Sequence, residues 1–426
     1  MTINALERLL SGTFADPDVA AMLSVPTRSV VIAESLAGAE ADLVAPLALG
    51  RRVAVVADPR TQAVLGGRVA DALAKIGSVS PIILSPEPHA DMETTAMVRE
   101  TARSVDALVA VGSGTINDLC KLAAAQLGKP YIVFGTAPSM NGYTSISAAI
   151  TDNAVKKSLA AKAPVGVFLD LTVLAAAPKR MIRSGLGDSL CRTTAQADWL
   201  MAHLLFDQPY RSAPFALLAE DEADLFGSAA ALVTGDLTAM RCLARTLVLS
   251  GFGMTICGGS HPASQGEHLI SHYVDMMADE TCPKTFHGEQ IGVTTLTMAA
   301  LQHRMLADQP PQLSATAIDR QSVIDHFGSE RGEECWREFA PKRLDDGRAA
   351  QLNARLVRDW SGIRQEILAI LRPVAELEAT LMMANCPTTP EALGWPPDLY
   401  GNAVRHAREL RGRYTFLDLA VDAGVL

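Results

Sequence analysis

Six short apolar runs of β type alternate with helix-compatible stretches in the first part of this chain. The β-type runs are residues 29–34, 52–57, 81–84, 107–111, 131–134 and 165–169. Stretches such as 65–75 and 92–103 between them are compatible with helices. This alternation predicts a mostly parallel sheet wrapped by helices. Such sheets bind ligands at the carboxyl ends of their strands, so the turns that follow the strands are the first candidates for a site.

After about residue 176 the strand signals fade and helical periodicity dominates. The predicted helices are 217–231, 237–249, 267–278, 290–302, 348–370 and 374–383. The length of 426 residues also exceeds what one small core needs. We therefore predict an α/β domain over 1–175 and an all-α domain over 176–426. No motif assigns a role to residues 306–400.

The charge pattern excludes several classes of protein. The formal net charge is −10, and no stretch gathers the Lys and Arg residues that nucleic-acid binding needs. Apolar runs are broken by Gly, Pro or charge before they reach membrane-spanning length, and the first residues do not resemble a signal peptide. Seven scattered cysteines without a CxxC pair favour a reducing compartment. We expect a cytoplasmic protein without a membrane or nucleic-acid partner.

A glycine-rich turn follows the predicted strand 107–111. Gly112, Ser113, Gly114 and Thr115 come directly before a predicted helix over 116–127. Glycines at such a turn let the backbone approach a ligand, and the N–H groups of the first helical turn suit a pyrophosphate. Position 117 is Asn, so the pattern departs from G-x-G-x-x-G. A tight turn without a ligand is the alternative.

A second polar turn follows the next predicted strand, 131–134. It contains Gly135, Thr136, Ala137, Pro138 and Ser139, and Ser145 lies shortly after it. Neighbouring parallel strands end at the same edge of a sheet, so the two turns are expected to converge on one crevice. Asp58 ends the strand 52–57 and is a candidate for hydrogen bonds to an adenosine ribose, which favours NAD over NADP. Its alternative role is to cap a helix that begins at Pro59.

Four of the nine histidines fall between residues 261 and 287. His268 and His272 are four residues apart, so they share one face of a helix. His287 opens another predicted helix, Asp188 follows Gly187, and His261 precedes a proline in a loop. Imidazole and carboxylate ligands suit a divalent metal, with zinc favoured and nickel or iron as alternatives. From spacing alone, separate and structurally satisfied histidines are an equally good interpretation.

Taken together, these segments resemble the glycerol-1-phosphate dehydrogenase family, which belongs with iron-containing alcohol dehydrogenases, glycerol dehydrogenases and dehydroquinate synthases. The resemblance rests on residues 112–121, 136–145, 187–188, 267–272, 287–290 and 413–420. It implies a Rossmann-like α/β domain with a parallel sheet, followed by an all-α domain as in dehydroquinate synthase. It also implies an active site in the cleft between the domains.

The resemblance further assigns roles to individual residues. Asp188, His268 and His287 would hold one divalent metal, and His272 would contact the substrate or relay a proton. NAD or NADP would be held by Asp58, Gly112, Ser113, Gly114, Thr115, Ile116, Asp118, Thr136, Ala137, Pro138, Ser139 and Ser145. The expected reaction is hydride transfer between sn-glycerol 1-phosphate and dihydroxyacetone phosphate. Substrate contacts are expected from Asn141, Asp188 and His272, and we expect a homo-oligomer whose size the sequence does not fix.

One position departs from the family pattern. Asn141 stands where the family usually has an acidic residue, so the negative charge is lost and two N–H donors are gained. This change keeps two alternatives open, a polyol dehydrogenase without a phosphate requirement and a nucleotide-binding protein that has lost catalysis. A lyase of the dehydroquinate synthase type is a third alternative, which would show no net formation of NADH. Ser260 and Ser264 are candidates for binding a substrate phosphate.

Overall fold

The computed structural model describes residues 4–152 and 155–426. The chain forms two compact units. Unit 1 comprises Met1–Ser189 and Ser212–Ser260, and unit 2 comprises Leu190–Arg211 and His261–Leu426. These bounds place residues 212–260 with the sheet, because helix α12 (Leu237–Ile256) contacts strand β1 (Ser29–Ala33) and helix α7 (Leu171–Ala175) of unit 1.

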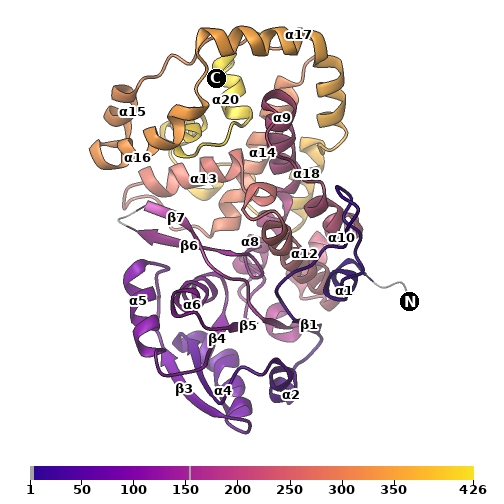
Figure 1. Ribbon diagram of the computed structural model, residues 1–426, viewed down its shortest axis with the longest axis vertical. Coiled ribbons are helices and arrows are strands. Elements are labelled where there is room, and N and C mark those ends of the chain that lie inside the picture. The colour runs from indigo at the N-terminus through magenta and orange to yellow at the C-terminus, as the bar shows by residue number, and fades with distance from the viewer. Residues whose placement is uncertain (1–3, 153–154) are drawn as a thin grey trace. The chain divides into compact units, whose positions relative to one another are not determined.

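A six-stranded parallel sheet forms the centre of unit 1 (Figure 1). Its strands are β1 (Ser29–Ala33), β2 (Arg52–Ala57), β3 (Ser78–Ile83), β4 (Ala107–Gly112), β5 (Tyr131–Gly135) and β8 (Gly166–Asp170), in the order β1-β8-β5-β4-β2-β3. Every residue of β4 is buried, as expected for a central strand whose two faces are both covered. The six predicted strands and the α/β fold class are therefore confirmed.

The register of β4 and β5 determines where their turns emerge. Gly112 of β4 pairs with Gly135 of β5, so both strands end at the same level of the sheet. Each of the two polar turns begins directly after this pair. The expectation that the two turns lie side by side is confirmed.

Helices surround this sheet in unit 1. They are α1 (Ala5–Leu10), α2 (Glu40–Val44), α3 (Pro59–Thr61), α4 (Gly67–Leu73), α5 (Met92–Thr101), α6 (Gly114–Leu127), α7 (Leu171–Ala175), α8 (Lys179–Leu190), α10 (Ala213–Gly227), α11 (Ala229–Thr234) and α12. An antiparallel hairpin of β6 (Ser147–Asp152) and β7 (Val155–Ala160) packs on α6 and was not predicted.

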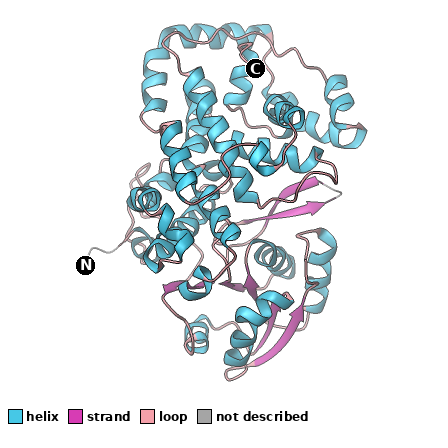
Figure 2. Cartoon of the chain, turned by 180° about the vertical axis from the view of Figure 1, so that it is seen from behind, coloured by secondary structure: helices cyan, strands magenta, loops and turns pink. Residues whose placement is uncertain are grey.

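Among the described residues of unit 2, every named secondary-structure element is a helix; helices are cyan in Figure 2. Its helices are α9 (Arg192–Phe206), α13 (Gly266–Met277), α14 (His287–Met305), α15 (Arg320–Phe327), α16 (Ser329–Phe339), α17 (Asp346–Leu368), α18 (Val374–Met383), α19 (Pro397–His406) and α20 (Phe416–Asp422). They enclose a core of residues such as Tyr273, Phe339, Leu356 and Phe416. The prediction of an all-helical second part is confirmed.

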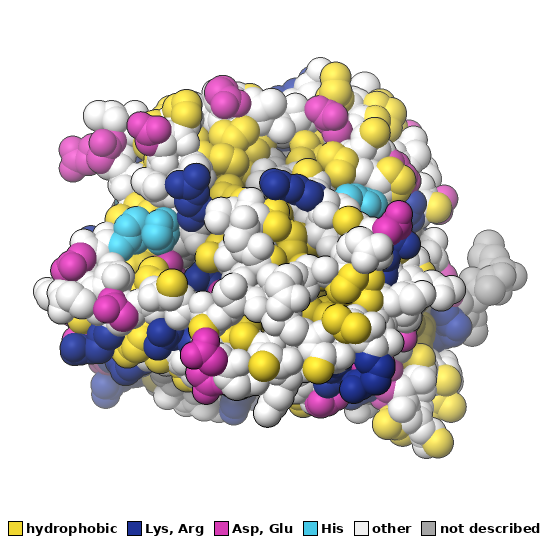
Figure 3. Space-filling model, turned by 90° about the horizontal axis from the view of Figure 1, so that it is seen from above, with side chains coloured by type: hydrophobic (Ala, Val, Ile, Leu, Met, Phe, Trp, Pro, Cys, Tyr) yellow, Lys and Arg dark blue, Asp and Glu magenta, His cyan; other side chains and the backbone are white. Residues whose placement is uncertain are grey.

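The surface agrees with the charge pattern of the sequence. On the face seen in Figure 3, basic side chains are interspersed with acidic and hydrophobic ones. No helix in the described part of the chain combines the length and the apolarity that a bilayer span requires.

Candidate functional site

The turn between β4 and α6 presents backbone N–H groups at the end of the sheet. The N–H of Asn117 is the first in α6 to reach a helical acceptor, the carbonyl oxygen of Ser113 at 2.9 Å. The N–H groups of Gly114, Thr115 and Ile116 precede it and have no carbonyl of a preceding helical turn to bond. A side chain at Gly112 would lie 2.6 Å from Ile116, so glycine is required there. This geometry suits a pyrophosphate.

The turn after β5 is fixed on both sides within unit 1. The N–H of Thr136 donates to the carbonyl of Gly112 at 3.1 Å, which links the two polar turns. Ser184 of α8 donates its hydroxyl to the carbonyl of Ser139 at 3.0 Å. Gly185 lies so close that an added Cβ would stand 1.7 Å from the carbonyl oxygen of Pro138. Helix α8 is therefore held directly against residues 136–139.

A buried lysine that the sequence analysis missed anchors the segment after this turn. Lys121 of α6 donates to the carbonyls of Gly142 at 2.6 Å and Ser147 at 2.9 Å, and to the hydroxyl of Ser145 at 2.9 Å. Burial lowers the pKa of Lys121, and the nearby Asp118 carboxylate opposes that shift. Asp118 also accepts the N–H of Ala149 at 3.0 Å. Two predicted cofactor residues, Asp118 and Ser145, thus hold the hairpin on α6.

Asp58 caps a helix in this structure. Its Oδ1 accepts the N–H groups of Arg60 and Thr61, both at 2.8 Å, and Thr61 completes a capping box. The alternative role considered from the sequence is therefore present. Because Oδ1 accepts both capping hydrogen bonds, Oδ2 is the oxygen that would contact an adenosine ribose. That contact stays a prediction.

Asp188 and Asn141 lie together in unit 1. Both are buried, and the backbone N–H of Asn141 donates to Asp188 Oδ2 at 2.8 Å. An acidic side chain at position 141 would stand beside the carboxylate of Asp188 and repel it, whereas an amide does not. Asn141 therefore removes a like charge from the neighbourhood of a predicted metal ligand.

Three predicted site histidines gather in unit 2. The ring centroids of His268 and His287 are 5.0 Å apart, and the ring of His272 lies 6.0 Å from each of them. Helix α13 carries His268 and His272 one turn apart, and His287 is the first residue of α14. Ser271 of α13 donates to Gln290 of α14, which ties the two helices together. His261 lies outside this group and stacks near Trp199, at 5.5 Å between ring centroids.

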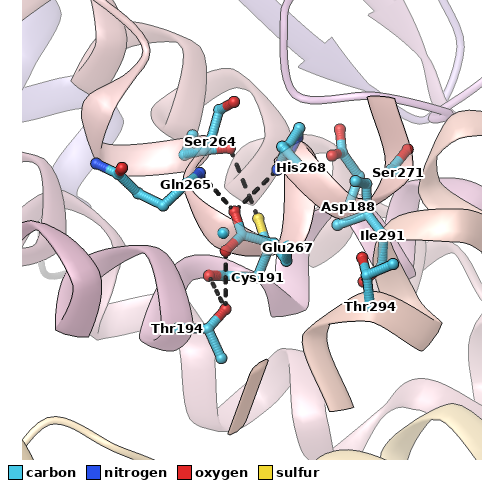
Figure 4. Close-up of polar contacts among 12 residues, drawn as sticks. Asp188, Cys191, Thr194, Ser264, Gln265, Glu267, His268, Ser271, Ile291 and Thr294 are labelled. Carbon is cyan, nitrogen blue, oxygen red and sulfur yellow. Dashed lines mark hydrogen bonds and ion pairs between the residues drawn. The ribbon is translucent and has the colours of Figure 1, made fainter. Parts of the chain in front are cut away.

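Glu267 supports His268 from below (Figure 4). Its Oε1 lies 2.9 Å from His268 Nδ1 and also accepts the N–H of Gln265 at 2.8 Å. A second possible set of metal ligands is present here. Each of Cys191, Glu267 and His268 offers one ligand atom, and these atoms lie within 4.8 Å of one another. Burial raises the pKa of Glu267 to about 7. A carboxylate that accepts Nδ1–H directs Nε2 of the same ring toward a metal, and a bound cation would favour the charged carboxylate.

Asp198 holds the helix that carries His268. Its Oδ2 accepts the N–H of Gly266, the first residue of α13, at 2.9 Å. Its Oδ1 accepts the N–H of Phe416 at 2.9 Å and the amide of Gln302 at 3.2 Å. Burial and the charge of Glu267 raise the pKa of Asp198 to about 8, and its hydrogen bonds with Phe416, Gly266 and Gln302 oppose that shift. No sequence motif marks Asp198, whereas Glu267 could have been found because it adjoins His268.

Comparison with known proteins defines the class first. The profile of the iron-containing alcohol dehydrogenase family matches residues 31–178. The structure resembles sulfoacetaldehyde reductase from Bifidobacterium kashiwanohense, with a TM-score of 0.60, 16% identity, and coverage of 94% of this chain and 96% of that one. It also resembles maleylacetate reductase from Agrobacterium tumefaciens, with a TM-score of 0.58, 18% identity and coverage of 90% of each chain. The fold is that of the iron-containing alcohol dehydrogenase class.

Sequence similarity then identifies the family. A glycerol-1-phosphate dehydrogenase of Geobacillus stearothermophilus is 30% identical over 375 residues, which are 86% of this chain and 85% of that protein. A second one, from Thermococcus kodakarensis, is 32% identical over 276 residues, 64% of this chain and 77% of that protein. The chain belongs to the glycerol-1-phosphate dehydrogenase family.

Proposed function

We propose that this chain is a metal-dependent NAD(P) oxidoreductase that interconverts sn-glycerol 1-phosphate and dihydroxyacetone phosphate. The observation that carries the proposal is 30% identity, over 85% of its length, to a relative named glycerol-1-phosphate dehydrogenase. The grouping of His268, His272 and His287 within unit 2 adds a chemical reason, because imidazoles in this number suit a metal centre. The name of this relative favours the proposed function over a polyol dehydrogenase without a phosphate requirement and over a lyase.

The donor set fits a divalent cation, with zinc as the first choice. Asp188, His268 and His287 each offer one ligand atom. Glu267 holds His268 by Nδ1, which is the arrangement that second-sphere carboxylates adopt around metal-bound histidines. When bound, the cation supplies Lewis-acid polarisation of the substrate oxygen.

Continuity of the chain supports Asp188 as the third ligand. Helix α8 carries Asp188 in its last turn, and Cys191 follows the helix with helical backbone angles. Residues three apart share one side of a helix, so Asp188 lies on the same side as Cys191. Cys191 offers a ligand atom within 4.8 Å of that of His268.

His272 is the proposed proton donor and acceptor. Arg411 approaches His272 Nδ1 with one guanidinium nitrogen, at 3.3 Å. A guanidinium has only donors, so Nδ1 must accept and the imidazole proton resides on Nε2. In this tautomer Nε2–H donates a hydrogen bond to the oxygen of a carbonyl that is being reduced. As Nε2 passes its proton to that oxygen, Nδ1 takes up a proton from solvent, so the ring stays neutral, and the reverse reaction runs the same relay backwards.

The cofactor would lie along the two polar turns of unit 1. The N–H groups at the start of α6 would bind its pyrophosphate, and Thr136 and Ser139 offer hydroxyls beside it. The nicotinamide supplies the hydride. A carboxylate at Asp58 favours NAD over NADP because it repels a 2′-phosphate.

Consumption of NADH by the purified, zinc-loaded protein tests this function. We expect oxidation of NADH with dihydroxyacetone phosphate at least 10-fold more efficient than with dihydroxyacetone, and a product of the sn-1 configuration. Glycerol 3-phosphate as product, equal use of the two ketones, or a reaction without net change in NADH would reject the proposal.

A further inference from the structure

Two arginines near the C-terminus reach the neighbourhood of the site histidines in unit 2. Arg411 donates to the hydroxyl of Ser264 at 3.2 Å and to His272 Nδ1 at 3.3 Å. Arg413 donates to the carbonyl oxygen of the same Ser264. Both arginines are partly exposed. They belong to a segment 139 residues or more beyond His272 in the sequence.

Two positively charged guanidinium groups lie close enough here to affect each other's pKa, and this arrangement favours the binding of an anion. Burial lowers the pKa of Arg411, and burial together with the charge of Arg411 lowers the pKa of Arg413 to about 9. Burial, with a smaller effect of both arginines, lowers the pKa of His261 to about 4, which keeps that ring neutral. The carboxylates of Glu267 and Glu338 oppose the shift of each arginine only as weaker, secondary contributions. A bound anion would remove the repulsion between the two guanidinium groups.

Arg408, by contrast, is an arginine of the same unit with a structural role. Arg408 forms an ion pair with Asp422 at 3.0 Å and approaches Asp418 at 4.0 Å. In the described residues, Arg411 has no carboxylate oxygen within the 4.0 Å of an ion pair, and its side-chain partners are a hydroxyl and an imidazole. Arg411 is therefore held in place without being neutralised, which is the arrangement that ligand-binding arginines need.

We infer that Arg411, Arg413 and the hydroxyl of Ser264 bind the phosphate group of a short phosphorylated ketone or alcohol, with its reacting oxygen directed to His272. The inference rests on the proposed function and adds the residues that select a phosphorylated substrate. Since Arg411 also contacts His272, phosphate binding and the orientation of the proton-carrying ring are coupled through one side chain. Of the two serines considered from the sequence, Ser264 is the one this cluster contains.

Two measurements on the full-length, zinc-loaded protein test the inference. The first is the ratio of kcat/KM for dihydroxyacetone phosphate to that for dihydroxyacetone, in the wild type, Arg411→Gln and Arg413→Gln. The second is calorimetric titration with inorganic phosphate in the presence of saturating NADH. Arg405→Gln is the matched control, because Arg405 is exposed on α19 in the same unit. Circular dichroism verifies that each variant is folded.

We expect each variant to lower the selectivity ratio and the affinity for phosphate by about 10- to 100-fold, as for a lost charge-assisted hydrogen bond. Arg405→Gln should change neither. If the wild type prefers the phosphorylated ketone and both variants retain that preference and their phosphate affinity, the inference is overturned. If the wild type reduces neither ketone, the proposed function falls, and loss of phosphate binding in the variants would still support the anion site.

Discussion

Replacing Asp198 by alanine should destabilise unit 2 more than any single surface change. The carboxylate accepts three hydrogen bonds from the N–H groups of Gly266 and Phe416 and the amide of Gln302. Asp198 is fully buried, so alanine would leave these donors without an acceptor. An orphaned buried donor costs about 1–3 kcal/mol, which gives about 3–9 kcal/mol for three. This range is a large part of the 5–15 kcal/mol that typically separates folded from unfolded proteins.

The tryptophans make this prediction easy to measure. All four, Trp199, Trp336, Trp360 and Trp395, belong to unit 2, so their fluorescence reports the unfolding of that unit in urea. Asp198→Asn keeps one oxygen and should lose less, about 1–3 kcal/mol, because fewer donors are orphaned. Glu366→Ala, at an exposed position on α17 of unit 2, is the control and should stay within about 0.5 kcal/mol. A loss below about 1 kcal/mol in Asp198→Ala would show that these three hydrogen bonds do not stabilise unit 2 as argued.

Three further changes test other parts of the account. Gly185→Ala would force a methyl group into the carbonyl of Pro138 and should cost about 1–3 kcal/mol or more, whereas Gly227→Ala, where nothing lies within 4 Å, should be neutral in the same thermal unfolding assay. The variant Glu267→Gln removes the charged partner of His268 Nδ1 and should weaken the affinity for zinc about 10-fold in a chelator competition. An unchanged zinc affinity would contradict the role of Glu267 in orienting His268. Burial and the neighbouring His406 lower the pKa of His326, with Glu409 opposing, so the folded state resists protonation while the unfolded chain accepts a proton below about pH 6.5. The free energy of unfolding should thus fall as the pH drops through this value. The variant His326→Gln keeps a polar partner for the Tyr273 hydroxyl and should lose less stability between pH 7.5 and 5.5 than the wild type. An equal loss would rule out His326 as the group responsible for this pH dependence.

The sheet could be predicted because its signals are local. Each strand is a short apolar run, and β4 and β5 end in glycine at the paired positions 112 and 135. The hairpin β6–β7 was missed because residues such as Ser147 and Ala149 lack the apolar alternation of a strand. It is held instead by Lys121 and Asp118, whose hydrogen bonds to residues 142–149 span about 20–30 positions.

The site was predictable only in part, for the same reason. His268 and His272 could be predicted because their four-residue spacing places them on one face of a helix. Asp198 and Arg411 carry no such signal, since their partners lie 68 to 218 and 139 to 147 residues away. The bounds of the units also depend on distant packing, because α12 returns to contact β1. The assignments of metal, cofactor and substrate residues remain predictions.

Measuring the metal content per chain is the decisive experiment for the proposed metal site. Purified protein should contain about one divalent cation, and His268→Ala and His287→Ala, like Asp188→Asn, should each lose it while the far-UV circular dichroism spectrum is preserved. A wild type that binds no cation after reconstitution with zinc, nickel or iron would contradict the account. So would three folded variants that all retain the metal.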